Sequence, residues 1–212
     1  GAMDVSEQEE LDRVIPVVEA LNARFDTIIS IDSSKAIVMQ AAVGAGAGLI
    51  NDVRALQEPN ALLIAAQLGV PVCLMHMRGQ PRSMQDAPYY DNVRLDVEAF
   101  LLTRARECVQ AGVRQDNILF DPGFGFGKNL AHNYQLLAQL DELHRLGYPL
   151  LVGMSRKSMI GQLLNRPVEE RLAGSVALAT IAALKGAHII RVHDVRETVD
   201  AVKIVSMIQK EK

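Results

Sequence analysis

The sequence is poor in the residues that define several protein classes. Among its 212 residues it has no tryptophan, two cysteines and 4% aromatic residues. So few aromatics favour helices layered on a sheet over an aromatic-rich β-sandwich. No apolar stretch approaches the roughly 20 residues that cross a bilayer, so we expect a soluble protein with no membrane partner. The composition predicts one α/β domain that covers the chain.

The charge is also unremarkable. Against 25 acidic residues there are 22 basic ones, the net charge is −3, and no long run of one sign occurs. A nucleic-acid partner is therefore not expected. Cys73 and Cys108 lack the spacing of a metal or redox motif, so we predict two buried thiols and a cytoplasmic location.

Short apolar runs that are typical of strands buried on both faces recur along the chain. Their starts lie between 21 and 47 residues apart, which leaves room for helical crossovers and predicts a parallel sheet. Two architectures fit: a complete six-stranded open sheet, or an eight-stranded barrel with two βα units absent. The runs are residues 27–32, 48–52, 70–76, 117–121, 149–154 and 188–193.

Every one of these runs ends in polar or ionisable groups, at the edge of a parallel sheet where ligands bind. A single strand-end aspartate such as Asp32 is often a helix cap, but the joint pattern is harder to explain in that way. The groups are Asp32; Asn51 and Asp52; Met75 and His76; Asp121; Ser155, Arg156 and Lys157; Arg191 and His193.

By chemistry, these residues form two sets. Asp32, Asn51 and Asp121 offer acceptors that suit a heterocycle rich in N–H donors. The second set offers cations and donors that suit a phosphate or pyrophosphate, and it comprises Lys157, Arg191 and His193, joined by Ser155 and Arg156. A phosphorylated, nitrogen-rich small molecule would match both sets.

Two loops carry further signals. DPGFGFGKN, residues 121–129, fits neither nucleotide-binding glycine pattern, and its alternating Gly and Phe indicate either a phenyl face beside a ligand or a tight turn with buried phenyls. GMSRKSMIG, residues 153–161, indicates either an anion site or a solvated basic loop.

Taken in order, the motifs SIDSSK, LINDVRAL, CLMHMRG, FDPGFGFGKN, VGMSRKSMIG and RVHDV resemble those of the bacterial dihydropteroate synthases. The resemblance implies a (β/α)₈ TIM barrel whose first two βα units are absent from this chain, residues 1–212. It also implies a sulfonamide-inhibited transferase of folate biosynthesis. This enzyme condenses dihydropterin pyrophosphate with para-aminobenzoate to give dihydropteroate and pyrophosphate. Mg²⁺ is the implied cofactor, with its protein ligand in the absent N-terminal loop, and a homodimer is the implied assembly.

The same resemblance assigns roles to individual residues. The implied pterin contacts are Asp32, Asn51, Val53, Met75, Asp121, Gly153 and Lys157; the pyrophosphate contacts Asn51, Arg191 and His193; the aminobenzoate contacts Gly125, Phe126, Ser155 and Lys157. Of these, Asp32, Asp121, Lys157, Arg191 and His193 are implied to be catalytic.

Two other functions stay open at this point. A catalytically impaired pterin-binding fragment would follow from the absent first loop. A pterin-dependent methyltransferase would keep the Asp and Asn contacts but has no need of the cationic set.

Overall fold

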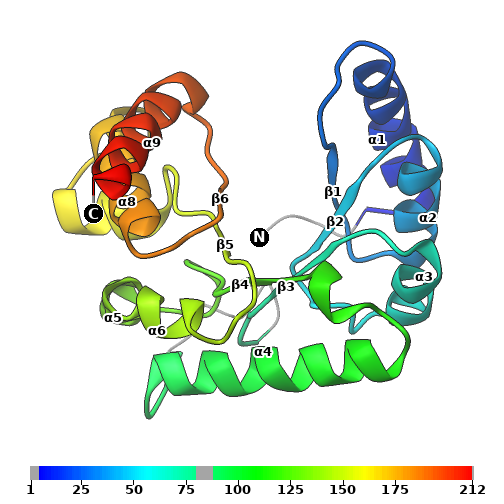
Figure 1. Ribbon diagram of the computed structural model, residues 1–212, viewed down its shortest axis with the longest axis horizontal. Coiled ribbons are helices and arrows are strands. Elements are labelled where there is room, and N and C mark those ends of the chain that lie inside the picture. The colour runs from blue at the N-terminus through cyan, green and yellow to red at the C-terminus, as the bar shows by residue number, and fades with distance from the viewer. Residues whose placement is uncertain (1–4, 80–87, 212) are drawn as a thin grey trace. The chain divides into compact units, whose positions relative to one another are not determined.

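The computed structural model describes residues 5–79 and 88–211. These residues fall into two compact units, one made of Gly1–Met77 with Ala99–Phe120 and the other of Arg78–Glu98 with Asp121–Lys212. Within each unit, short strands alternate with helices along the chain (Figure 1).

The first unit is built on a sheet in the order β1-β2-β3-β4. The β1–β2 and β2–β3 pairs are parallel, and Asp32 lies opposite Asn51 in the first of them. Every residue of β2, β3 and β4 is buried, as expected for strands covered on both faces. The strands are β1 (Ser30–Asp32), β2 (Leu49–Asp52), β3 (Val72–Met75) and β4 (Ile118–Asp121).

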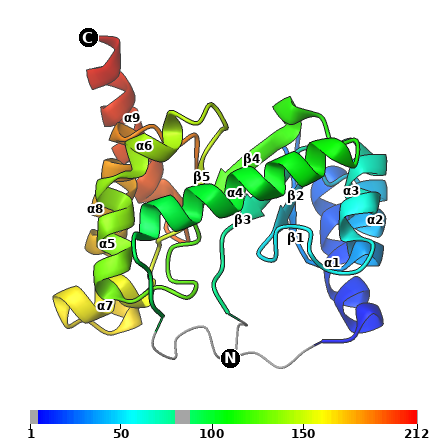
Figure 2. The ribbon, with the colours of Figure 1, turned by 90° about the horizontal axis from the view of Figure 1, so that it is seen from below.

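Three helices of this unit pack side by side in chain order, α1 on α2 and α2 on α3 (Figure 2). The first begins at Ser6, whose Oγ accepts the N–H of Glu9, and it continues through Pro16. The helices are α1 (Glu7–Asn22), α2 (Ala36–Gly44), α3 (Ala61–Leu68) and the long α4 (Val93–Gln110), which belongs to this unit from Ala99 onward, with a short 3₁₀ turn η1 (Gln115–Asn117) before β4.

The second unit contains the parallel pair β5 (Leu151–Val152) and β6 (Ile189–Ile190). Among its helices, α8 packs against α9 and against β6. The helices are α5 (Leu130–Ala138), α6 (Leu140–His144), α7 (Ser158–Leu164), α8 (Leu172–Leu184) and α9 (Val195–Lys210), with the 3₁₀ turn η2 (Val168–Glu170) between α7 and α8.

Each of the six predicted runs contains a strand, so the α/β alternation is confirmed. The strands are shorter than the runs, and this changes the placement of two residues. We predicted that Arg191 and His193 lie within the last strand, but β6 ends at Ile190. The Arg191 N–H still donates to the carbonyl of Val152 at 2.8 Å, and the chain then turns into α9 at Val195, which leaves His193 in a loop.

The two cysteines are buried and form no disulfide, as predicted. Burial raises the pKa of Cys108 to about 11, so this thiol stays protonated at neutral pH and is a poor nucleophile. Within residues 5–79 and 88–211, no helix is both long enough and apolar enough to span a membrane.

Truncation of the fully buried Leu74 in β3 tests the core of the first unit. We expect Leu74→Ala to lower the free energy of unfolding by about 2–5 kcal/mol, because it leaves a cavity between packed layers. Leu63→Ala on α3 is the control, since that side chain is 55% exposed. Urea unfolding would measure both, and equal losses would contradict this assignment of the core.

Candidate active site at the strand ends

In the first unit, the predicted pterin contacts share one face of the sheet. Asp32 and Asn51 are neighbours in register, and Asn51 is paired in turn with Cys73 of β3. Side chains alternate along a strand, so Met75, two residues beyond Cys73, points to the same side as Asn51. Asn51 and Met75 are buried, whereas Asp32 and Val53 keep access to solvent.

Asp32 is not the N-cap residue of α2. That residue is Lys35, whose side chain makes no capping hydrogen bond and whose N–H donates to the Oγ of Ser33 at 3.2 Å. Substrate binding stays a prediction for Asp32.

Asn51 carries the clearest sign of a ligand site in this unit. Its Oδ1 is buried and, among the described residues, has no hydrogen-bond partner. A buried acceptor without a donor costs free energy, so such an atom usually has a ligand or water as its partner. The amide oxygen of Asn51 is thus an acceptor suited to an N–H group of a substrate.

In the second unit, the glycine loop after β4 is sharply bent. Gly123, Gly125 and Gly127 all have positive φ, of 70°, 81° and 63°. Phe124 is fully buried, while Phe126 stays partly exposed. One phenyl is therefore buried in a tight turn and the other is only partly covered, so the alternative with two buried phenyls does not hold.

Asp121 begins this loop and is nearly buried, with 7% of its surface exposed. Its Oδ1 accepts the N–H of Gly123 at 2.7 Å. Burial raises the pKa of Asp121, and the positive charge of Lys157, then the Gly123 hydrogen bond and the charges of Lys128 and Arg191, oppose that rise. A carboxylate in this position favours a substrate that brings N–H donors of its own.

Lys157 connects the two predicted loops. Its Nζ donates to the carbonyl of Phe124 at 2.6 Å and lies 4.6 Å from the ring centroid of Phe126, a cation–π distance. A Cβ at Gly125 would come within 3.2 Å of the Lys157 Cδ, in a backbone conformation that L residues rarely adopt. Lys157, Gly125 and Phe126 are therefore together, as the predicted aminobenzoate contacts require.

Sequence reasoning missed two residues that hold this loop. Lys128 is 2% exposed, and its Nζ donates to the carbonyls of Gly123 and Phe126 at 2.9 and 3.2 Å. Asn133 on α5 accepts the N–H of Gly125 at 2.7 Å and donates to the carbonyls of Lys128 and Asn129. Burial is the main reason why the pKa of Lys128 is lowered to about 7. A lysine that ends a glycine loop after a buried strand was the available signal.

Some of the residues that we predicted to bind a phosphate or pyrophosphate lie close together in the structure. His193 Nδ1 lies 2.9 Å from Ser155 Oγ, which also accepts the backbone N–H of His193 at 3.1 Å. Gly153 lies beside Arg191, because a Cβ built there would be 3.7 Å from the Arg191 Cβ. Arg156 differs from the expectation, since its guanidinium forms a two-point ion pair with Asp194 and thereby braces the start of α9.

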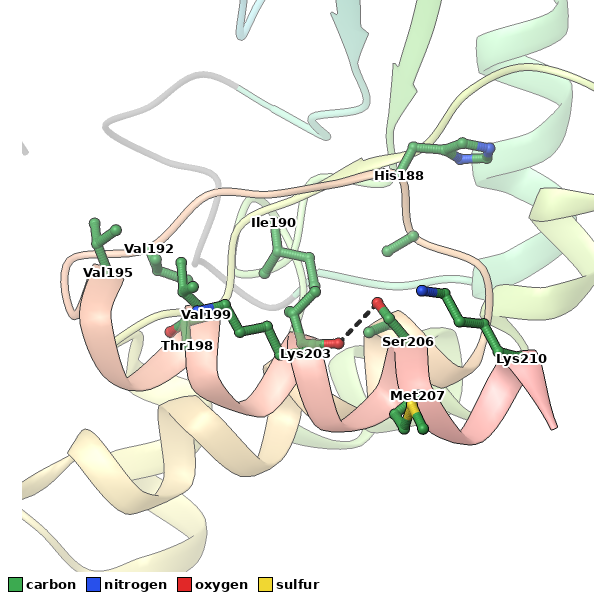
Figure 3. Close-up of a pocket in the computed structure, with 13 residues that line it drawn as sticks. His188, Ile190, Val192, Val195, Thr198, Val199, Lys203, Ser206, Met207 and Lys210 are labelled. Atoms are coloured by element: carbon green, nitrogen blue, oxygen red, sulfur yellow. Dashed lines mark hydrogen bonds between the residues drawn. The ribbon is translucent and has the colours of Figure 1, made fainter.

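A cavity of about 610 Å³ lies between β6 and α9 (Figure 3). Its walls are mainly apolar and include His188, Ile190 and Val192. Ile190 and Val192 line the cavity, while Arg191, the residue between them, does not. The predicted site residues are absent from its lining.

A resident metal is not supported by the side chains that the structure describes. Over residues 5–79 and 88–211 there is no group of three or more His, Cys, Asp or Glu side chains that could hold an ion. Mg²⁺ is commonly held by one or two carboxylates together with substrate phosphates. The described residues therefore do not fit a magnesium site formed by the protein alone, and we assign no chemical step to one.

The buried lysine gives a prediction for stability against pH. As the pH rises from 7 to 9, an unfolded Lys128 keeps its proton, whereas the folded one, with a pKa of about 7, progressively loses it. The unfolded state then binds more protons, so wild-type stability should rise relative to Lys128→Met by about 1 kcal/mol per pH unit. A neutral amine still has two N–H bonds, enough for both carbonyls. Denaturant unfolding at a series of pH values measures the free energy of unfolding of both proteins. If the two free energies changed with pH in parallel, the prediction would be contradicted. The control is Lys203→Met, at an exposed position on α9.

Comparisons with known proteins agree with this chemistry. Residues 1–193 match the model of a family described as pterin binding enzyme. The dihydropteroate synthase of Haemophilus influenzae is 60% identical over 204 residues, which are 96% of this chain and 74% of that protein.

Two solved structures are similar over nearly the whole chain. The Yersinia pestis dihydropteroate synthase with a bound sulfonamide drug is 62% identical, with a TM-score of 0.98, and the match covers 99% of this chain and 76% of that one. The Xanthomonas albilineans enzyme in complex with 7,8-dihydropteroate is 50% identical, with a TM-score of 0.92, over 99% and 77% of the two chains. These neighbours and the parallel strands fit a TIM-barrel-type fold. The chain therefore belongs to the pterin-binding enzyme family and, within it, to the bacterial dihydropteroate synthases.

Proposed function

We propose that the chain carries out the dihydropteroate synthase reaction of folate biosynthesis and that residues 1–212 act as one functional domain. The polar residues at its strand ends are the substrate-binding groups. The observation that carries these assignments is the buried Oδ1 of Asn51, an acceptor without a donor among the described residues and a neighbour in register of Asp32. A pterin offers the N–H groups that such acceptors need.

The pterin is held by hydrogen-bond acceptors at the strand ends in this proposal. Asp32, Asn51 and Asp121 accept its N–H groups, and a carboxylate that accepts two parallel N–H bonds gains from the fixed geometry. Val53 and Met75 line the flat faces of the ring beside Asn51. Lys157 and Gly153 are the remaining proposed pterin contacts. The hydrogen bond from Lys157 to the loop that begins at Asp121 supports the assignment of Lys157.

Para-aminobenzoate binds against Phe126 and Gly125. The partly exposed phenyl ring supplies an aromatic face, and the Lys157 ammonium beside it supplies a positive charge for the carboxylate. Ser155 contributes a hydroxyl at the carboxylate end. Aniline nitrogen is a modest nucleophile, so holding it in line with the pterin methylene carbon is the main contribution of these residues.

The chemical step is a substitution at the exocyclic methylene carbon of the pterin. The C–O bond to pyrophosphate breaks first, and its electron pair leaves with the pyrophosphate, whose charge Arg191, His193 and Asn51 stabilise. Asp32 and Asp121 stabilise the cationic pterin that remains. The arylamine nitrogen then forms the N–C bond and loses one proton to solvent, which gives dihydropteroate without an enzyme-bound covalent intermediate.

Three further expectations belong to the same proposal. Mg²⁺ accompanies the pyrophosphate of the substrate as its counterion. The chain forms a homodimer through its last helices, which is supported by the exposure of Ile204 and Met207 on α9, 64% and 60%. A cytoplasmic location suits two buried cysteines that form no disulfide.

Turnover tests the function directly. With dihydropterin pyrophosphate and Mg²⁺ present, we expect pyrophosphate release that depends on added para-aminobenzoate, together with formation of dihydropteroate. Pterin binding in calorimetry without any turnover would instead support a non-catalytic pterin-binding fragment. A methyltransferase would release no pyrophosphate at all.

Asp121→Asn tests one assignment quantitatively. The change removes a charge-assisted hydrogen bond, so we expect pterin binding to weaken by about 1–3 kcal/mol, measured by calorimetry. Asp116→Asn is the control, since Asp116 is exposed in η1 and paired with Arg114. Unchanged affinity in Asp121→Asn would remove that residue from the site.

A further inference from the structure

The loop between β2 and α3 contains an unusual stretch of backbone. Ala55 and Leu56 are consecutive residues with positive φ, of 52° and 59°, and neither is glycine. The left-handed region is unfavourable for a residue with a Cβ, and it persists only where the surroundings enforce it. Both residues are buried, so water does not satisfy their backbone polar groups.

A buried carboxylate holds this stretch from its amide side. Asp52 is fully buried, and its Oδ1 accepts the N–H of Arg54 at 2.8 Å while its Oδ2 accepts the N–H of Leu56 at 2.7 Å. The Oγ of Ser34 donates to the same Oδ1. Ser34 lies two residues after Asp32, so one carboxylate joins the chain segments that follow β1 and β2.

A buried guanidinium holds the stretch from its carbonyl side. Arg104 on α4 is 8% exposed; its Nε donates to the carbonyl of Ala55 at 2.9 Å and its Nη2 to that of Leu56 at 3.2 Å. Leu56 is therefore fixed at both its N–H and its C=O by charged groups. Lysine could not reproduce this, because only the planar fork of arginine reaches two adjacent carbonyls with fixed geometry.

Asp52 also lies between two proposed pterin contacts in the sequence. Side chains alternate on either side of a strand, so the Asp52 carboxylate that anchors the loop points away from the face that Asn51 occupies. Anything that fixes the backbone at Asp52 fixes the direction in which Asn51 and Val53 leave the chain. The Oδ1 of Asn51 lacks a hydrogen bond among the described residues that would orient it independently.

We propose that Asp52 and Arg104 are positioning residues for pterin binding, which clamp the strained Ala55–Leu56 backbone from opposite sides and thereby aim Asn51 at the substrate. The inference rests on the proposed role of Asn51 as a pterin contact. It assigns a function to two buried charges that take no part in the chemical step.

A double-mutant cycle tests the clamp. Calorimetry with dihydropterin pyrophosphate, in the absence of para-aminobenzoate, gives the Kd of the wild type, Asp52→Asn, Asn51→Ala and the double variant. We expect Asp52→Asn to raise the Kd by about tenfold in the wild-type background and by less than about twofold when Asn51 is already alanine. Equal effects in both backgrounds, or no effect in either, would overturn the proposal.

The outcome for Asn51→Ala separates this inference from the function on which it rests. If that variant alone binds the pterin as tightly as the wild type, the role of Asn51 as a pterin contact is wrong. If it weakens binding while Asp52→Asn does not, the clamp alone is wrong.

Arg104→Lys provides a second variant that keeps the charge. We expect it to raise the KM for dihydropterin pyrophosphate by several-fold, on the order of fivefold, with the KM for para-aminobenzoate unchanged. Leu101→Val, a buried position one turn earlier on α4, is the control for lost packing. A fall in melting temperature with both KM values as in the wild type, which is the pattern expected of Leu101→Val, would show that Arg104 is only structural.

Discussion

The loops that follow the strands depend on one constraint, which is that buried backbone polar groups need hydrogen-bond partners. In the first unit, Asp52 and Arg104 supply those partners for the Ala55–Leu56 stretch. In the second, Lys128 and Asn133 do so for the glycine loop. Burial raises the pKa of Asp52, and the hydrogen bonds from Ser34, Arg54 and Leu56 oppose this rise. The hydrogen bonds that shape the loop therefore also favour the ionised form of the Asp52 carboxylate.

This arrangement separates the groups that shape the site from those proposed to touch substrate. The shaping groups are fully or almost fully buried, and each forms hydrogen bonds with backbone groups of the loop that it holds. The proposed contacts differ: Asn51 keeps an acceptor without a donor among the described residues, and Phe126 keeps an exposed face. Catalysis by orientation needs this division, because a contact residue is useful only if its direction is set before the substrate arrives.

Much of the fold was predictable from sequence because the signals were strong and local. Six apolar runs indicated six strands, and the β-α alternation followed from their spacing. The end of a strand was harder to predict. The apolar pattern continues to Val192, but the strand β6 ends at Ile190, so His193 lies outside it. The residue at which a strand ends depends on hydrogen-bond partners that are distant in the sequence, and the apolar periodicity of the sequence does not indicate these partners.

For the site, sequence identified residues whose chemistry is visible in a motif and missed those whose role depends on burial. Arg156 looked like an anion-binding cation beside Lys157, yet Asp194, far along the chain, pairs with it. Arg104 lies in none of the motifs, and only the structure shows its guanidinium donating to two carbonyls of a distant loop. Neither partner could be inferred from spacing along the sequence.

The inert cysteines have a practical consequence for spectroscopy. Both thiols lie in the interior of the first unit, so a maleimide reagent would leave the folded chain unlabelled. A single cysteine introduced at an exposed position, such as Leu63 on α3, would therefore carry a fluorophore or spin label without first replacing Cys73 and Cys108. The native chain is therefore already suited to labelling at one chosen site while substrates bind.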